Sequence, residues 1–219
     1  MKQLILISAV LFSFNGWAEK ITLDYEQIIS MNLEEFFPMG GGIFSTIPSA
    51  DAYSSQSFLV IDGDTIKLLD ENETIHLFGI DSPELSYNGM AQYCERPSGQ
   101  IWKCGERASK YLEGLINSSP DNKLICVPID KDFERYRPKG ETYAGIDALC
   151  YVKNSLGMAD LQGKMVEAGM AIVDQKSTLK EKRYSWEELL AMRNSTGIWS
   201  GAFLSPEEWR EKNKPKKVP

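Results

Sequence analysis

Two short acidic motifs carry side chains that are suited to binding a metal ion. Asp62 and Asp64 lie in the sequence Asp-Gly-Asp-Thr, and Asp81 and Glu84 lie in Asp-Ser-Pro-Glu. Each motif contains or follows the end of an apolar, β-branched run, so we expect the carboxylates at the ends of neighbouring strands. Hard divalent cations such as calcium prefer carboxylate and carbonyl oxygens. Each motif alone is a common turn sequence, but two acidic turns on neighbouring strands can form a calcium site.

Five strands and three helices are expected to position these motifs. The strand-like runs cover 58–61, 65–69, 74–80, 124–129 and 148–152. Helical periodicity covers 104–116, 160–168 and 184–193. This order predicts an α+β fold, mainly β, in which a five-stranded, OB-fold-like Greek-key barrel carries about three packed helices. Such a barrel leaves one face and its loops open for ligands.

The N-terminus has the features of a signal peptide. Lys2 precedes an apolar run from Leu4 to Phe14, and Gly16 and Ala18 form a small-residue cleavage site. An uncleaved anchor or a buried N-terminal helix is the alternative, but the run is short for a span. We expect four parts: a signal peptide at 1–18, an extension or linker at 19–56, one domain at 57–210 and a basic, disordered tail at 211–219. The mature protein is expected to be periplasmic or secreted, without a membrane span.

The cysteines favour disulfides over a zinc site. The chain has four cysteines and one histidine, and the cysteines show no CxxC spacing. In an oxidising compartment, local pairing joins Cys94 with Cys104 and Cys126 with Cys150. Three connectivities are possible, and free buried thiols are the alternative.

The net charge argues against a broad electrostatic grip on nucleic acid. The formal charge is −7, and loss of Lys2 with the signal peptide makes it −8. A polyanion would therefore have to bind at a local patch.

Several blocks of sequence resemble the staphylococcal-nuclease-like (thermonuclease) family in order and spacing. The blocks are VIDGDTIKL at 60–68, IHLFGIDSPE at 75–84, CGERASKYLEGL at 104–115, MVEAGMAIV at 165–173 and GIWSGAF at 197–203, followed by Trp209-Arg210. The resemblance covers roughly residues 57 to 210. The cysteine-containing insert between Glu84 and Gly105 is similar to that of secreted bacterial members.

The resemblance implies calcium-dependent cleavage of DNA and RNA phosphodiesters. It implies that Asp64 and Asp81 bind calcium, that the carbonyl of Ser82 is a further ligand, and that Asp62 supports the site. It also implies that Glu84 acts on the attacking water as a general base or by orienting it. Tyr136 and Tyr143 are expected on the ligand face. The expected substrate is DNA or RNA, preferably single-stranded, bound by a monomer.

The chain departs from the family at two arginines. His76 occupies the first arginine position, and Gly145 aligns with the second. Arg135 and Arg137 lie in a displaced copy of the second segment and could replace it, or they could be solvated loop residues. Loss of one transition-state donor typically costs about 2.7 to 4 kcal/mol, so both losses together could leave almost no activity.

Three functions therefore stay open. The first is an extracytoplasmic calcium-dependent endonuclease. The second is a catalytically degenerate module that binds nucleic acid, an envelope component or a protein. The third is a nuclease tuned to acid, in which protonated His76 replaces an arginine and activity falls above pH ~6.5.

Overall fold

The structure is a computed structural model. It describes residues 52–129, 145–154, 157–174 and 183–214, together with the backbone of three strands at 7–10, 20–23 and 43–44. The chain divides into two compact units, Met1–Pro38 and Met39–Pro219. In the first unit, β1 (Ile7–Val10) pairs antiparallel with β2 (Lys20–Leu23). β1 falls within the apolar run of the expected signal peptide, and β2 follows the expected cleavage site.

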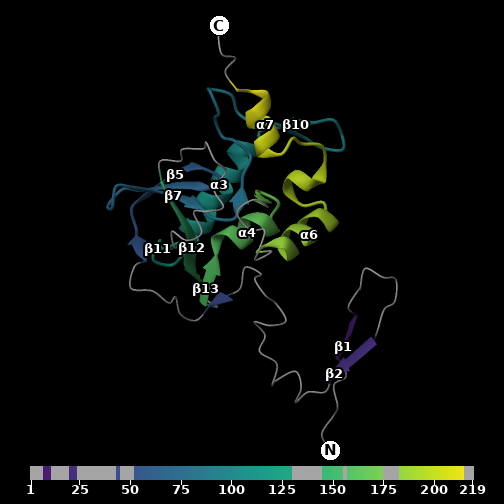
Figure 1. The fold of residues 1–219 in the computed structure, drawn as a ribbon, viewed down its shortest axis with the longest axis horizontal. Helices are drawn as coiled ribbons and strands as arrows, with labels where there is room; N and C mark the ends of the chain where they lie inside the picture. Colours follow the sequence, from purple (N-terminus) through teal and green to yellow (C-terminus); the bar gives the residue numbers. More distant parts are fainter. Residues whose placement is uncertain are drawn as a thin grey trace, which may run out of the picture. The chain divides into compact units, whose positions relative to one another are not determined.

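A curled sheet forms the framework of the second unit (Figure 1). Its strands run in the order β3 (Ile43–Phe44), β13 (Gly157–Asp160), β12 (Ile146–Asn154), β7 (Glu73–Leu77), β6 (Thr65–Leu68) and β5 (Phe58–Asp62). β12 and β7 are parallel, whereas the other neighbours along this path are antiparallel. Two further strands complete the sheet: β11 (Leu124–Pro128) pairs with β12, and β4 (Tyr53–Ser55) pairs with β11.

The sheet curls because one continuous stretch of chain, β4 followed by β5, forms strands at two opposite edges of the sheet. Only Gln56 and Ser57 separate β4 from β5, yet β4 pairs with β11 while β5 pairs with β6. The two sides of the sheet are thereby brought together. The result is a mixed fold, mostly strands, with a barrel-like sheet, in agreement with the expected α+β class.

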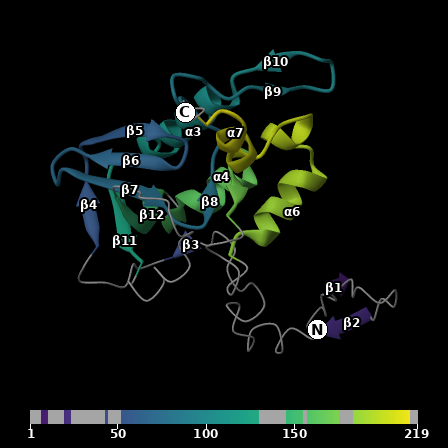
Figure 2. The ribbon, with the colours of Figure 1, turned by 45° about the horizontal axis from the view of Figure 1, so that its top comes forward.

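Four α-helices occur in the described part of the chain: α3 (Cys104–Asn117), α4 (Leu161–Glu167), α6 (Ser185–Arg193) and α7 (Pro206–Lys212). α3 packs on β5, α4 packs on β12 and α3, and α6 packs on α4. Figure 2 shows α7 beyond one end of β5, β6 and β7. The buried faces of α3 and α4 meet the sheet in one core, which includes Ile66, Ile75, Leu112, Leu161 and Met165.

Two small β-ribbons and two disulfides complete the second unit. β8 (Ile80–Asp81) pairs with β14 (Ile172–Val173), and β9 (Cys94–Glu95) pairs with β10 (Ile101–Trp102). A short 3₁₀-helix, η2, covers Gly197–Ser200. Cys94 is bonded to Cys104, and Cys126 is bonded to its direct cross-strand neighbour Cys150. The expected local pairing is confirmed, and such bonds are compatible with an oxidising compartment.

The three expected helices and four of the five expected strands are present, with small shifts at their ends. The run at 74–80, expected as one strand, is divided: β7 ends at Leu77 and Ile80 belongs to β8 in a separate sheet, because the chain turns at Gly79, which has a φ of 85°. β3 and β4 lie within 19–56, the stretch expected to be an extension or linker. Both strands pair with strands of the main sheet, so part of that stretch belongs to the sheet. α7 is a fourth helix, and it continues to Lys212 in the expected tail. None of the described helices combines the length and apolarity needed to cross a bilayer.

Candidate functional site

The turn between β5 and β6 places two carboxylates at the end of the sheet. Asp62 ends β5, and Asp64 follows in the turn. Asp64 Oδ1 accepts a hydrogen bond from the Thr65 hydroxyl at 2.9 Å, and its Oδ2 accepts one from the Ser82 N–H at 2.9 Å. Asp64 therefore ties this turn to the chain that follows β8.

Asp81 ends β8, and Glu84 lies in the segment that follows. The N–H of Leu85 donates to both oxygens of Asp62, at 3.0 and 3.1 Å, which holds this segment against the first turn. The backbone of Glu84 also lies against α3, since a Cβ at Gly105 would meet the Glu84 carbonyl oxygen at 1.9 Å. Any larger residue at position 105 would therefore push Glu84 away.

Gln92 fixes the Glu84 segment from the other side. Its side-chain Oε1 accepts from the Glu84 N–H at 3.1 Å, and its own N–H donates to the Glu84 carbonyl at 2.9 Å. Gln92 Nε2 also donates to the Leu204 carbonyl at 2.8 Å, just before α7. Gln92 is fully buried, so one side chain positions both Glu84 and the approach to α7.

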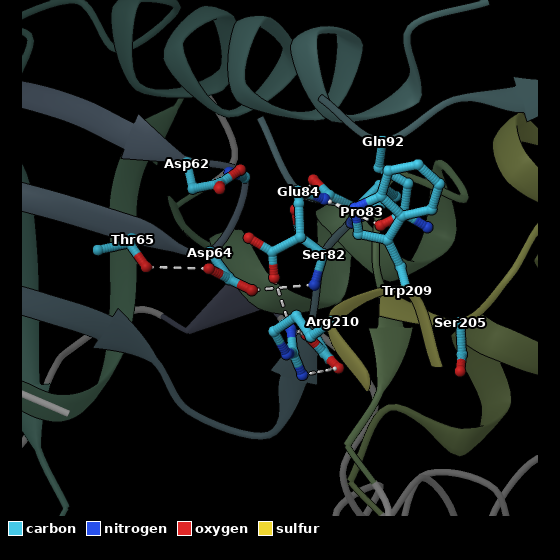
Figure 3. Close-up of polar contacts among 12 residues, drawn as sticks. Asp62, Asp64, Thr65, Ser82, Pro83, Glu84, Gln92, Ser205, Trp209 and Arg210 are labelled. Atoms are coloured by element: carbon cyan, nitrogen blue, oxygen red, sulfur yellow. Dashed lines mark hydrogen bonds and ion pairs between the residues drawn. The ribbon is translucent and has the colours of Figure 1, made fainter. Parts of the chain in front are cut away.

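Arg210 on α7 binds two of the four carboxylates directly. Its Nη1 and Nη2 donate to the two oxygens of Asp81, each at 2.9 Å, and Nη1 donates to Glu84 Oε1 at 2.7 Å. α7 begins at a capping box in which Ser205 and Glu208 bond reciprocally. Figure 3 shows Asp64, Glu84 and Arg210 converging from three separate segments.

Negative charge exceeds positive charge in this cluster. Burial, with help from the charges of Asp64 and Glu84, raises the pKa of Asp62 to about 8. Burial raises the pKa of Asp81 to about 7 and also raises the pKa of Glu84, although Arg210 opposes both shifts. Burial lowers the pKa of Arg210, but its bonds to the two carboxylates outweigh this effect, and Arg210 stays charged. One guanidinium does not balance four carboxylates, so the cluster favours binding of a proton or a cation.

The oxygen-only donor set fits a hard cation such as calcium. Asp64, Asp81 and the Ser82 carbonyl are the groups expected to bind it, with Asp62 in support. Among the residues that the structure describes, no three His, Cys, Asp or Glu side chains form a ready-made metal-binding group. Asp81 is instead paired with Arg210, and calcium would share Asp81 with that arginine. Such sharing is possible because two carboxylate oxygens offer about four lone-pair sites.

The two positions where the family resemblance places arginines lie next to each other. Asp147 is the register partner of His76 in the β12–β7 pair, and Gly145 lies two residues before Asp147. A Cβ at Gly145 would approach the His76 ring to 2.7 Å. The Nδ1 of His76 lies 3.1 Å from the Thr65 hydroxyl. The Thr65 hydroxyl donates its single proton to Asp64, so it can only accept a hydrogen bond from His76, in the tautomer that carries the proton on Nδ1. His76 is thus joined to Asp64 through Thr65.

The structure therefore brings together Asp62, Asp64, Asp81, Ser82 and Glu84, and it joins His76 to them. Four other expected site residues, Arg135, Arg137, Tyr136 and Tyr143, lie outside the described residues.

Arg210 and Gln92 are site residues that the motifs do not identify. Arg210 closes the last of the family-like blocks, and Ser-Pro-Glu-Glu at 205–208 is a recognisable helix start. These signals place Arg210 on a helix, but its contact with Asp81 spans 129 residues and depends on tertiary packing.

No protein-family model and no curated protein matches this chain.

Proposed function

We propose that this protein is a calcium-dependent endonuclease of the staphylococcal-nuclease-like family that acts outside the cytoplasm. The convergence of four carboxylates at the ends of β5 and β8 carries the proposal. If β4 and β5 are taken as one continuous strand, they form a curled five-stranded sheet with β6, β7, β12 and β11. This arrangement supports an OB-type Greek-key barrel beneath the four carboxylates. The two disulfides support an oxidising compartment. The substrate is DNA or RNA, preferably single-stranded, and the enzyme acts as a monomer.

Each site residue has a distinct role in this proposal. Asp64, Asp81 and the Ser82 carbonyl hold the ion, and Asp62 supports them. Calcium bound there supplies Lewis-acid stabilisation of the charge on the nonbridging phosphate oxygens. Glu84 orients the attacking water and accepts its proton. Burial raises the pKa of Glu84, which strengthens its carboxylate as a base.

A matched pair of glutamate variants tests the proposal. Labelled single-stranded DNA is incubated with the mature protein in calcium or in chelator. We expect calcium-dependent cutting by wild type, a loss of about a hundredfold or more in Glu84→Gln, and unchanged cutting in Glu113→Gln, which alters an exposed carboxylate on α3. If wild type cuts at no pH from about 5 to 10, the proposal is wrong.

A degenerate binding module is the second candidate, and it is favoured by His76 and Gly145 at the two positions where the family resemblance places arginines, because a side chain at Gly145 would meet the His76 ring. Neither residue supplies the bidentate, permanently charged fork of an arginine. Calcium-dependent binding of single-stranded DNA without cleavage by wild type would select this candidate.

A further inference from the structure

We infer that Arg210 is the catalytic arginine of this site and that it binds a nonbridging oxygen of the scissile phosphate. This inference rests on the proposed nuclease function. In the described part of the chain, Arg210 is the one Lys or Arg side chain hydrogen-bonded to any of the four site carboxylates. Arg210 therefore supplies to the carboxylate cluster the arginine charge that the family resemblance expects from positions 76 and 145.

The hydrogen bonds of Arg210 leave one edge of the guanidinium available. Asp81 takes one N–H from Nη1 and one from Nη2, and Glu84 takes the second N–H of Nη1. A guanidinium has five N–H donors. No hydrogen bond within the described residues uses Nε–H or the second N–H of Nη2. These two neighbouring donors form the planar fork that binds two phosphate oxygens.

The Arg210 side chain is partly exposed, and its guanidinium is held in place. The Arg210 side chain is 22% exposed, compared with 17% for Asp81 and 15% for Glu84. The two carboxylates hold the guanidinium on one side. Gln92 is hydrogen-bonded to the backbone of both Glu84 and Leu204. The same side chain therefore positions Glu84, which orients the attacking water, and the start of α7, which carries Arg210. Such preorganisation is what a donor to a developing negative charge requires.

Arg210→Ala and Arg210→Lys are compared with Lys212→Ala, which removes the same charge from an exposed position on α7. We expect Arg210→Ala to lower the cleavage rate about a hundred- to a thousandfold. Arg210→Lys should stay at least about tenfold slow, because a lysine paired with Asp81 has no second fork. Lys212→Ala should cut like wild type. Millimolar methylguanidine should partly restore Arg210→Ala and should not restore Glu84→Gln.

A binding measurement separates the phosphate contact from a structural role. In a Glu84→Gln background, in which cleavage of bound DNA is about a hundredfold or more slower, fluorescence anisotropy gives the affinity for labelled single-stranded DNA in calcium at several salt concentrations. Arg210→Ala should reduce the slope of log affinity against log salt by about 0.7, the value for one phosphate contact to a single strand. Near-ultraviolet circular dichroism and calcium-dependent thermal stabilisation report whether the variant is folded; if Arg210→Ala is not, Arg210→Lys carries the test.

The results distinguish this inference from the proposed function. If wild type cuts DNA with calcium but folded Arg210→Ala cuts as fast or faster, Arg210 is only an internal counter-ion and the inference is wrong. If the salt slope is unchanged in Arg210→Ala, the phosphate contact is absent and the inference is also wrong. If wild type neither binds calcium nor cuts DNA, the proposed function itself has failed.

Discussion

Asp62→Asn tests whether the acidic cluster is an electrostatically unfavourable site that a cation relieves. Asp62 accepts hydrogen bonds from the N–H groups of Gly63 at 2.7 Å and of Leu85 at 3.0 and 3.1 Å. Asparagine keeps one oxygen acceptor for these donors and removes the charge. The variant therefore changes mainly the electrostatics of the cluster.

The direction and size of the effect follow from the pKa. Burial raises the pKa of Asp62 in the folded protein to about 8 from an ordinary value of 3.8, so the folded state binds the proton more tightly. The stability that this proton contributes is present at acid pH and is lost as pH rises towards 8. Each pH unit corresponds to about 1.4 kcal/mol, which gives an upper limit of about 4 kcal/mol between pH 4 and 7. Partial access of water reduces this to about 2 to 4 kcal/mol.

Thermal unfolding in chelator measures the effect. We expect Asp62→Asn to match wild type near pH 4 and to melt about 4 to 16 °C higher near pH 7, since about 1 kcal/mol corresponds to 2 to 4 °C for a chain of this size. Excess calcium should reduce this advantage, because ionised Asp62 supports the ion. Glu113→Gln serves as the exposed control. A lower melting temperature of Asp62→Asn near pH 7, or the same difference at both pH values, would refute the reasoning.

Two further predictions concern residues that support the fold. Gly145→Ala should lower the free energy of unfolding by about 1 to 3 kcal/mol, because the new Cβ overlaps the His76 ring. His76→Ala should relieve part of this cost, and additive urea-unfolding energies in the double-mutant cycle would contradict the clash. Burial raises the pKa of Asp160 to about 6, so wild type should lose up to about 3 kcal/mol of stability relative to Asp160→Asn between about pH 4 and 6. A pH-independent difference in unfolding energy would show that Asp160 carries no such penalty.

Much of the fold could be predicted because its signals are local. β-branched runs around the Asp-Gly turn define β5 and β6, and the spacing of Ala108 and Leu112 defines the buried face of α3. The local pairing of the cysteines is confirmed because Cys126 and Cys150 are register partners. The joining of β4 to β11 could not be predicted, since it depends on a non-local pairing of a short, polar segment.

The candidate site was also predictable only in part, because some of its contacts are non-local. Asp62 ends β5 and Asp81 ends β8, as the turn residues beside them predict. These two strands belong to different sheets, so the carboxylates are brought together by the bonds from the Ser82 N–H to Asp64 and from the Leu85 N–H to Asp62. The pairing of Arg210 with Asp81 and the bridge from Gln92 to Leu204 depend on how α7 packs. No local spacing encodes such contacts between distant segments.

Calcium titration of chelator-treated wild-type protein, with binding followed by calorimetry and cleavage followed on labelled single-stranded DNA, tests the central claim most directly. We expect one strongly bound calcium per chain and cleavage that rises over the same range of calcium concentration. Cleavage that persists in chelator, or calcium binding with no cleavage at any concentration, would contradict it.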